Sequence, residues 1–171
     1  MLAFNESLVV TQLDVPDAHT VIDVLASKLH AQGLVVAAYG AQTFAREQEH
    51  PTGLPTKPFC IAFPHADADG VCSSALALAT LARPVMFKNM GDPDEELPVH
   101  LVLMLANRDP EEQVRTLRNL ALLFSKPDKL VALRDQPTAQ AAAACLISEL
   151  GLDEQENERG QVSERRDSER E

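Results

Sequence analysis

The sequence predicts a single α/β domain in which a mixed β-sheet is flanked by helices. Its 171 residues are 45% apolar, which is enough to form one sizeable core. Short apolar runs bounded by proline or glycine, typical of buried strands, alternate with longer segments whose apolar residues recur every three or four positions, as on one face of a helix. Strands and helices mixed along one chain favour two or three packed layers.

Two helices are expected in the first third of the chain. The first covers residues 16–32, where apolar residues recur at fourfold spacing and Gly33 follows as a stop. The second covers residues 37–50 and ends before Pro51, because the residue preceding a proline disfavours helical geometry. Prolines and a glycine then predict a loop over residues 52–58.

Four apolar runs are expected to form strands. Residues 59–63 lie between two prolines and are short and apolar, as a buried strand is. Residues 99–106 form a second buried run of the same kind. The other two expected strands cover residues 75–82 and 85–87, and an acidic loop is expected over residues 90–98.

The most complete set of helix signals covers residues 110–124. Asp109 is placed to cap the helix, Pro110 takes its first position, and Glu112 stands three residues after the cap. These signals predict that the helix begins at Pro110. The apolar stripe expected to face the core consists of Val114, Leu117, Ala121 and Phe124.

The predicted domain covers residues 1–151, and a charged tail follows it. Two helices, over residues 128–133 and 137–150, complete the domain, with Gly151 as the final stop. Residues 152–171 contain eight acidic residues and four arginines and hardly any large apolar side chain. Such a segment buries too little surface to offset the entropy of ordering, so the tail is expected to be disordered.

Composition excludes several classes of function. The formal net charge is −11, which disfavours contact with the phosphate backbone of nucleic acids. No apolar run approaches the roughly 20 residues that span a bilayer, and the N-terminus does not resemble a signal peptide. The cysteines are odd in number and form no Cys-x-x-Cys pair, so neither a disulfide framework nor a zinc finger is expected: Cys60, Cys72 and Cys145. A cytoplasmic location without membrane insertion is therefore predicted.

His65 is the first candidate for a chemical role. It follows the apolar run 59–63 and Pro64, whose ring fixes the backbone, and a polar segment containing Gly70 comes after it. A histidine at a strand end, on a rigid support and facing a loop, is well placed to react. Two interpretations are open at this point, because the imidazole could equally be satisfied by a bond to a backbone carbonyl.

The same segment also allows a metal interpretation. His65, Asp67 and Asp69 alternate, so an extended chain would place all three side chains on one face. The segment also resembles the start of a calcium loop with Gly70 at its sixth position, but Leu76 stands where that loop requires glutamate. No metal is expected here, and solvated carboxylates are the preferred interpretation.

Arg46 is the second candidate. Its planar guanidinium could hold phosphate oxygens near a reactive histidine. The alternative is that the charged segment 45–50 is a solvated helix end, with Arg46 paired to Gln42 or Glu49 one turn away. No glycine-rich phosphate loop is present, so no nucleotide or other cofactor is expected.

Three stretches taken together resemble the enzyme IIA family of the phosphoenolpyruvate-dependent sugar phosphotransferase system. They are Arg46-Glu47, then Pro51-Thr52-Gly53-Leu54, then Ile61-Ala62-Phe63-Pro64-His65-Ala66. The chain is similar to the fructose/mannitol superfamily, and the Arg-Glu-x-x-x-Pro-Thr-Gly spacing is most like that of galactitol-type members. The resemblance covers about residues 5–151 and implies the α/β fold of that family, here over residues 1–151.

The resemblance implies a role as a phosphocarrier. Family members accept a phosphoryl group from the histidine phosphocarrier protein, on Nε2 of the histidine that matches His65. They pass it to a IIB component, typically to its cysteine, for uptake of a sugar or sugar alcohol through a membrane IIC component. The arginine matching Arg46 helps to hold the phosphoryl group. Fructose and mannitol members often have a second histidine at a place that falls near Gln113 here, and its absence favours the galactitol type.

Two alternatives remain beside this interpretation. The same fold occurs in regulatory modules that sense phosphorylation and bind targets instead of supplying a transporter. An alternative from another class is a metal-dependent hydrolase built on His65, Asp67 and Asp69.

Overall fold

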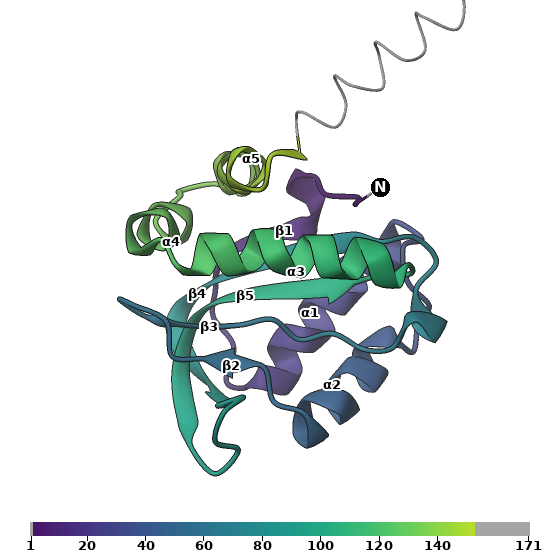
Figure 1. The fold of residues 1–171 in the computed structure, drawn as a ribbon, viewed down its shortest axis with the longest axis horizontal. Helices are drawn as coiled ribbons and strands as arrows, with labels where there is room; N and C mark the ends of the chain where they lie inside the picture. The colour runs from purple at the N-terminus through teal and green to yellow at the C-terminus, as the bar shows by residue number, and fades with distance from the viewer. Residues whose placement is uncertain (1, 153–171) are drawn as a thin grey trace, which may run out of the picture.

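The computed structural model describes residues 2–152, and the predicted charged tail lies outside the described residues except for Leu152. The chain forms a five-stranded mixed sheet in the order β1-β4-β5-β3-β2 (Figure 1). β1 and β3 run parallel to their neighbours β4 and β5, whereas the β4–β5 and β2–β3 pairs are antiparallel. The strands are β1 (Val9–Leu13), β2 (Gly53–Leu54), β3 (Cys60–Ala62), β4 (Ala75–Lys88) and β5 (Glu96–Ala106).

Helices cover both faces of the sheet, so the predicted α/β fold with a mixed, helix-flanked sheet is confirmed. α1 (Ala18–Ala31) and α2 (Tyr39–Glu49) lie on one face (Figure 1). α3 (Pro110–Phe124), α4 (Pro127–Arg134) and α5 (Ala139–Leu150) lie on the other. Two short 3₁₀ turns complete the described part, η1 (Glu6–Leu8) and η2 (Ala68–Gly70). None of the helices within residues 2–152 is long and apolar enough to cross a membrane.

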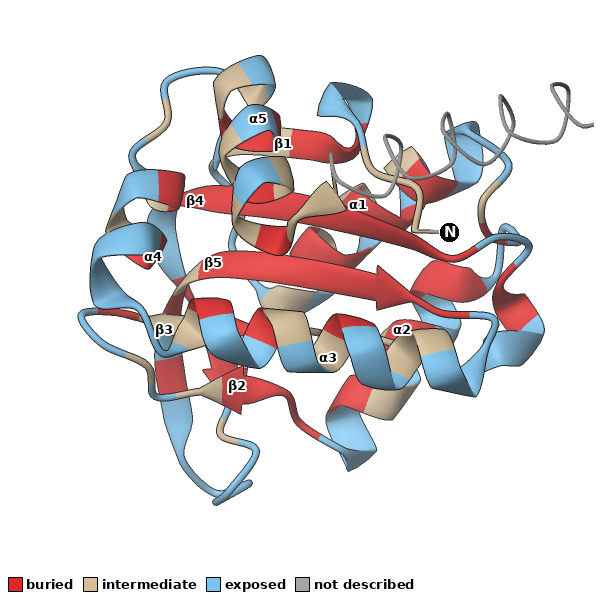
Figure 2. Ribbon diagram, turned by 45° about the horizontal axis from the view of Figure 1, so that its top comes forward, coloured by how far each residue is buried: buried red, intermediate tan, exposed pale blue. Residues whose placement is uncertain are grey.

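The two central strands form the core by alternation. Figure 2 shows β4 and β5 buried along most of their length. Successive side chains of a strand point to opposite faces, so Leu76 and Leu78 pack toward α3–α5 while Ala77 and Ala79 pack toward α1. The same alternation along β5 gives each face of the sheet its own apolar layer. Burial on both faces explains why these runs are apolar throughout.

The expected helices are found close to their predicted bounds. Asp109 caps α3 by accepting a hydrogen bond from the backbone N–H of Glu111, and Pro110 is the first residue of the helix. Gly33 and Gly151 have φ values of +69° and +65°, the left-handed geometry with which helices often end. These local signals were sufficient to predict the ends of the helices, because caps and stops act within one helical turn.

The strand predictions need three corrections. β4 is one strand with an irregular register between Thr80 and Val85, where two strands were predicted. β5 begins at Glu96, so its first residues belong to the segment predicted as an acidic loop. β1 and β2 were not predicted, and β2 begins at Gly53 inside the predicted loop. Short edge strands are set by their partners in the sheet, which periodicity alone does not reveal.

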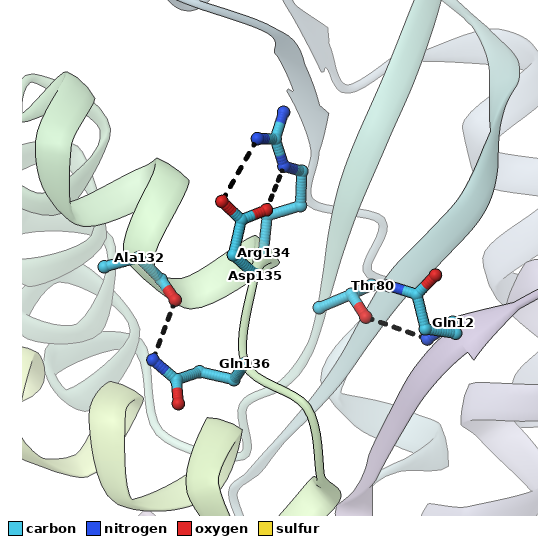
Figure 3. Close-up of polar contacts among 6 residues, drawn as sticks. All are labelled: Gln12, Thr80, Ala132, Arg134, Asp135 and Gln136. Atoms are coloured by element: carbon cyan, nitrogen blue, oxygen red, sulfur yellow. Dashed lines mark hydrogen bonds and ion pairs between the residues drawn. The ribbon is translucent and has the colours of Figure 1, made fainter.

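Tertiary contacts fix the edges of the sheet. Gln12 in β1 has a φ of +55°, and its backbone N–H donates to the buried Thr80 hydroxyl at 3.0 Å (Figure 3). At the end of α4, the Arg134 guanidinium binds the neighbouring Asp135 (Figure 3). It also lies 4.7 Å from the ring centre of Phe59. The Gln12–Thr80 and Arg134–Phe59 contacts join residues far apart in the sequence, so neither was predictable from local patterns.

The predicted apolar stripe of α3 is confirmed for Leu117 and Phe124, which pack against the core, and wrong for Val114 and Ala121. Val114 is 60% exposed and Ala121 is exposed, whereas the buried residues are Thr116, Leu120 and Leu123. Both sets repeat every three or four residues, so periodicity does not distinguish them. The observed face is the one on which Leu120 and Leu123 meet the leucines of β5.

We expect Leu120→Ala to reduce the free energy of unfolding by about 2–4 kcal/mol, because it removes a fully buried side chain and leaves a cavity. Val114→Ala on the same helix should change it by no more than about 0.5 kcal/mol, since that side chain is exposed. Urea denaturation of both variants measures the difference. Equal losses would mean that α3 packs through a different face.

Candidate functional site

His65 lies beside the carboxyl end of β5. After β3 ends at Ala62, the chain continues parallel to β5, and the Leu105 N–H donates to the Pro64 carbonyl at 3.1 Å. His65 and Leu105 form a single parallel bridge. The predicted placement of this histidine after a strand is therefore observed, and main-chain pairing to a buried strand fixes its backbone.

Tyr39 anchors the same segment from the opposite side. It is the first residue of α2 and is fully buried. Its hydroxyl donates to the Leu105 carbonyl at 2.5 Å and accepts a hydrogen bond from the Ala66 N–H at 3.2 Å. Burial raises the pKa of Tyr39, and the Ala66 bond opposes that rise. The hydroxyl therefore joins α2, β5 and the His65 segment, a role that the sequence did not suggest.

The imidazole of His65 has a defined orientation. Its Nδ1 lies 3.0 Å from the Phe63 carbonyl oxygen, and its ring stacks on the Phe63 ring at an interplanar angle of 9°. A carbonyl oxygen only accepts hydrogen bonds, so Nδ1 must carry the proton. In the neutral ring, Nε2 then has a free lone pair. The bond to a backbone carbonyl that the sequence left open is present, and it leaves Nε2 as the nucleophilic nitrogen.

Arg46 contacts the segment that follows His65. Its Nη1 lies 3.1 Å from a carboxylate oxygen of Asp67. The pairing within α2, with Gln42 or Glu49, that the sequence offered as an alternative is not the ion pair that forms. The Arg46 and Asp67 side chains are 38% and 83% exposed, so this pair contributes little to stability. Its effect is to direct the guanidinium toward the His65 loop.

Two neighbouring cavities border this region. One, of about 340 Å³, brings Arg46 and His65 together, and the other, of about 290 Å³, lies against Asp67 and Asp69. Gln113 lines neither of them. The first is lined by Arg46, Glu49, His50, Pro51, Thr52, His65, Met90 and Pro93, and the second by Gln42, Ala45, Arg46, Glu49, His50, Ala66, Asp67 and Asp69.

Glu47 is a buried residue that binds Thr52, one of the residues lining the larger cavity. It is only 7% exposed, and its carboxylate accepts hydrogen bonds from the Thr52 N–H at 2.9 Å and the Thr52 hydroxyl at 2.8 Å. Burial raises the pKa of Glu47 to about 7, although the two bonds from Thr52 lower it. The interpretation of residues 45–50 as a solvated helix end is wrong for Glu47.

Gly53, which follows Thr52, packs closely against the end of β4. A Cβ atom on Gly53 would lie 2.5 Å from the Lys88 carbonyl oxygen, too close for any other residue without a shift of the backbone. The Gly53 carbonyl also accepts a hydrogen bond from the Met90 N–H at 2.8 Å. The turn that carries Thr52 is thereby held against Met90, which lines the larger cavity.

The metal interpretation does not agree with the structure. The 3₁₀ turn η2 begins at Ala68, so the chain is not extended through Asp69. His65 lines one cavity, whereas Asp67 and Asp69 line the other. Within residues 2–152, no group of three or more histidine, cysteine, aspartate or glutamate side chains is arranged to hold a metal ion.

Comparison with known proteins identifies related sequences. Residues 2–149 match the family model described as phosphoenolpyruvate-dependent sugar phosphotransferase system, EIIA 2. The galactitol-specific EIIA component of Escherichia coli K12 is 32% identical over 124 residues, which are 72% of this chain and 82% of that protein. The transcriptional regulator ManR of Bacillus subtilis is 33% identical over 130 residues, which are 76% of this chain and 17% of the regulator.

Solved structures show the same fold. The mannitol enzyme IIA of Escherichia coli superimposes with a TM-score of 0.67 at 17% identity, over 87% of this chain and 99% of that one. A structure of the same kind of domain, described as a complex of enzyme IIAMTL and phosphorylated enzyme IIBMTL, gives a TM-score of 0.70 at 17% identity. It covers 88% of this chain and 99% of that one.

The raised pKa of Glu47 predicts a pH dependence of stability. A carboxyl whose pKa rises on folding, here from 4.5 to about 7, binds its proton more tightly in the folded state. The protonated Glu47 side chain therefore stabilises the fold below pH 4.5. This stabilisation, on the order of 3 kcal/mol in the free energy of unfolding, is lost as the pH rises through about 7. Glu47→Gln should flatten the decline in free energy of unfolding between pH 5 and 8. Urea denaturation across that range measures it, and an unchanged slope would exclude Glu47 as the cause.

Proposed function

Because this chain belongs to the EIIA 2 family of the phosphoenolpyruvate-dependent sugar phosphotransferase system, we propose that it carries a phosphoryl group on Nε2 of His65. The observation that most supports this assignment is the bond between His65 Nδ1 and the Phe63 carbonyl. It places the proton on Nδ1, so the neutral ring presents Nε2 as the nucleophile without a prior proton transfer.

The proposed reaction consists of two transfers. In the first, the Nε2 lone pair of His65 attacks the phosphorus carried by the histidine phosphocarrier protein, and the P–N bond to that protein breaks with its electron pair. In the second, a thiolate of a IIB component attacks the same phosphorus, an S–P bond forms, and Nε2 recovers its lone pair. Such transfers depend mainly on in-line positioning and charge stabilisation.

Arg46 would stabilise the phosphoryl oxygens. It lines the same cavity as His65, and its guanidinium is paired with an exposed carboxylate, Asp67, which lines the neighbouring cavity. An exposed ion pair is weak, so exchanging Asp67 for the more highly charged phosphoryl group costs little. A planar guanidinium can bind two phosphoryl oxygens at once.

The proposed partners are a donor, an acceptor and a membrane component. The complex of enzyme IIAMTL with phosphorylated IIBMTL supports a IIB component as the acceptor. We propose the histidine phosphocarrier protein as the donor. A membrane IIC component would then use the phosphoryl group during uptake of a sugar or sugar alcohol. The described cysteines are free thiols, Cys60, Cys72 and Cys145, which agrees with a cytoplasmic location for these exchanges.

The similarity to ManR supports a second candidate function, a regulatory module in which His65 reports phosphorylation to a target protein. Its chemistry at His65 would be the same, and only the fate of the phosphoryl group differs. Transfer from phosphorylated protein to a IIB component separates the two, because a purely regulatory module would not complete that step at a useful rate.

We expect His65→Ala to accept no phosphoryl group after incubation with phosphoenolpyruvate, enzyme I and the phosphocarrier protein, because the nucleophile is gone. Intact mass spectrometry measures the product. His19→Ala is a matched control, since His19 is half exposed and lines neither cavity, and it should gain one phosphoryl group like the wild type. Labelling of His65→Ala would refute the assignment.

Arg46→Gln should slow transfer to His65 by about 30- to 1000-fold, because one charged donor is lost from the transition state. Arg46→Lys should recover only part of the rate, since an ammonium group lacks the planar fork of donors. Rapid-quench measurement of transfer from the phosphocarrier protein provides both rates.

Arg83→Gln is the matched control. It removes another exposed arginine that has an aspartate partner, Asp14, and that lies outside both cavities, so it should transfer at the wild-type rate. A wild-type rate in Arg46→Gln would exclude Arg46 from the site.

A further inference from the structure

We propose that His50 supplies a second imidazole to the phosphoryl group on His65, by donating a ring N–H to one of its oxygens. The inference rests on the proposed function and assigns a catalytic group at the end of α2. His50 was part of a charged segment in the sequence and received no role there. Its place in the fold is what suggests one.

The backbone places His50 beside Arg46. The His50 N–H donates to the Arg46 carbonyl at 2.6 Å, which closes the last turn of α2. His50 is the first residue after α2, and this bond keeps its backbone one turn beyond that of Arg46. Both line the 340 Å³ cavity that His65 also lines, and both line the neighbouring 290 Å³ cavity.

The position of His50 is held from both sides. On its N-terminal side it completes α2, and on its C-terminal side Pro51 and Thr52 are buried. Thr52 is bound through its N–H and its hydroxyl to the Glu47 carboxylate. The backbone of His50 therefore lies between two fixed points, as a preorganised donor requires, while its side chain stays exposed and accessible to a bound group.

The side chains around the cavity include too few hydrogen-bond donors for a phosphoryl group unless His50 is one of them. A phosphoryl group adds about 1.5–2 negative charges and three acceptor oxygens. Arg46 is the arginine that lines the cavity, and Asp67 and Glu49 beside it are acidic. One guanidinium with two nearby carboxylates does not satisfy three oxygens, and His50 is the lining side chain besides Arg46 and His65 that offers an N–H donor. Gln113 lines neither cavity.

The test compares His50→Ala, His50→Gln and the control His19→Ala by rapid-quench transfer from the phosphocarrier protein. His50→Ala should slow labelling by about 10- to 100-fold, the effect of one hydrogen bond to a charged group, yet still reach one phosphoryl group per chain. His50→Gln should recover part of the rate because its amide still donates an N–H. The melting temperature should stay near the wild-type value for all three variants.

A second readout separates a contact with the phosphoryl group from a structural role. In ¹⁵N-histidine NMR spectra of the wild type, the ring nitrogens of His50 should shift when His65 is phosphorylated, whereas those of His19 should not. A wild-type rate in His50→Ala, or a His50 signal that does not move on phosphorylation, would overturn this inference and leave the proposed function intact. Failure of the wild type to accept any phosphoryl group would overturn both.

Discussion

The arrangement around His65 depends on the buried hydroxyl of Tyr39. This single group accepts the Ala66 N–H and donates to the Leu105 carbonyl, so it connects α2, the end of β5 and the loop that follows His65. Without it, the Ala66 N–H and the fully buried Leu105 carbonyl would lose this hydrogen bond, and a buried backbone group left unpaired costs more than an ordinary hydrogen bond contributes. Because α2 also carries Arg46 and is followed by His50, the same hydroxyl ties the element that holds these two residues to the His65 loop.

The region combines rigid supports with weakly held side chains, and this suits a carrier. Main-chain pairing, Tyr39 and the bonds between Glu47 and Thr52 fix the backbone on both sides of the cavity. The Arg46–Asp67 pair, in contrast, is exposed and exchanges at little cost. A group that must receive a phosphoryl group and then release it gains from fixed geometry, but very strong binding of either state would slow one of the two transfers.

The sequence was informative where the determinants are local or where a motif is complete. The strand before His65, the cap at Asp109 and the presence of Arg46 beside the same cavity as His65 were all predictable. Glu47 was misjudged because a glutamate near a helix end is usually solvated, and its burial depends on Thr52 in the next turn. The apolar stripe of α3 was predicted only in part, because overlapping sets of residues share the helical period. Packing in the cluster that includes the β5 leucines selects the set with Leu120 and Leu123.

The central claim is that Nε2 of His65 holds the phosphoryl group. Nδ1 meanwhile keeps its proton and donates it in a hydrogen bond to the Phe63 carbonyl. The most direct measurement is ¹⁵N–³¹P correlation NMR of protein labelled with ¹⁵N-histidine and phosphorylated from phosphoenolpyruvate. Our account predicts one phosphohistidine, with phosphorus coupled to the ring nitrogen Nε2 of His65 and with Nδ1 protonated. Coupling to Nδ1, or to a nitrogen of another histidine, would contradict it.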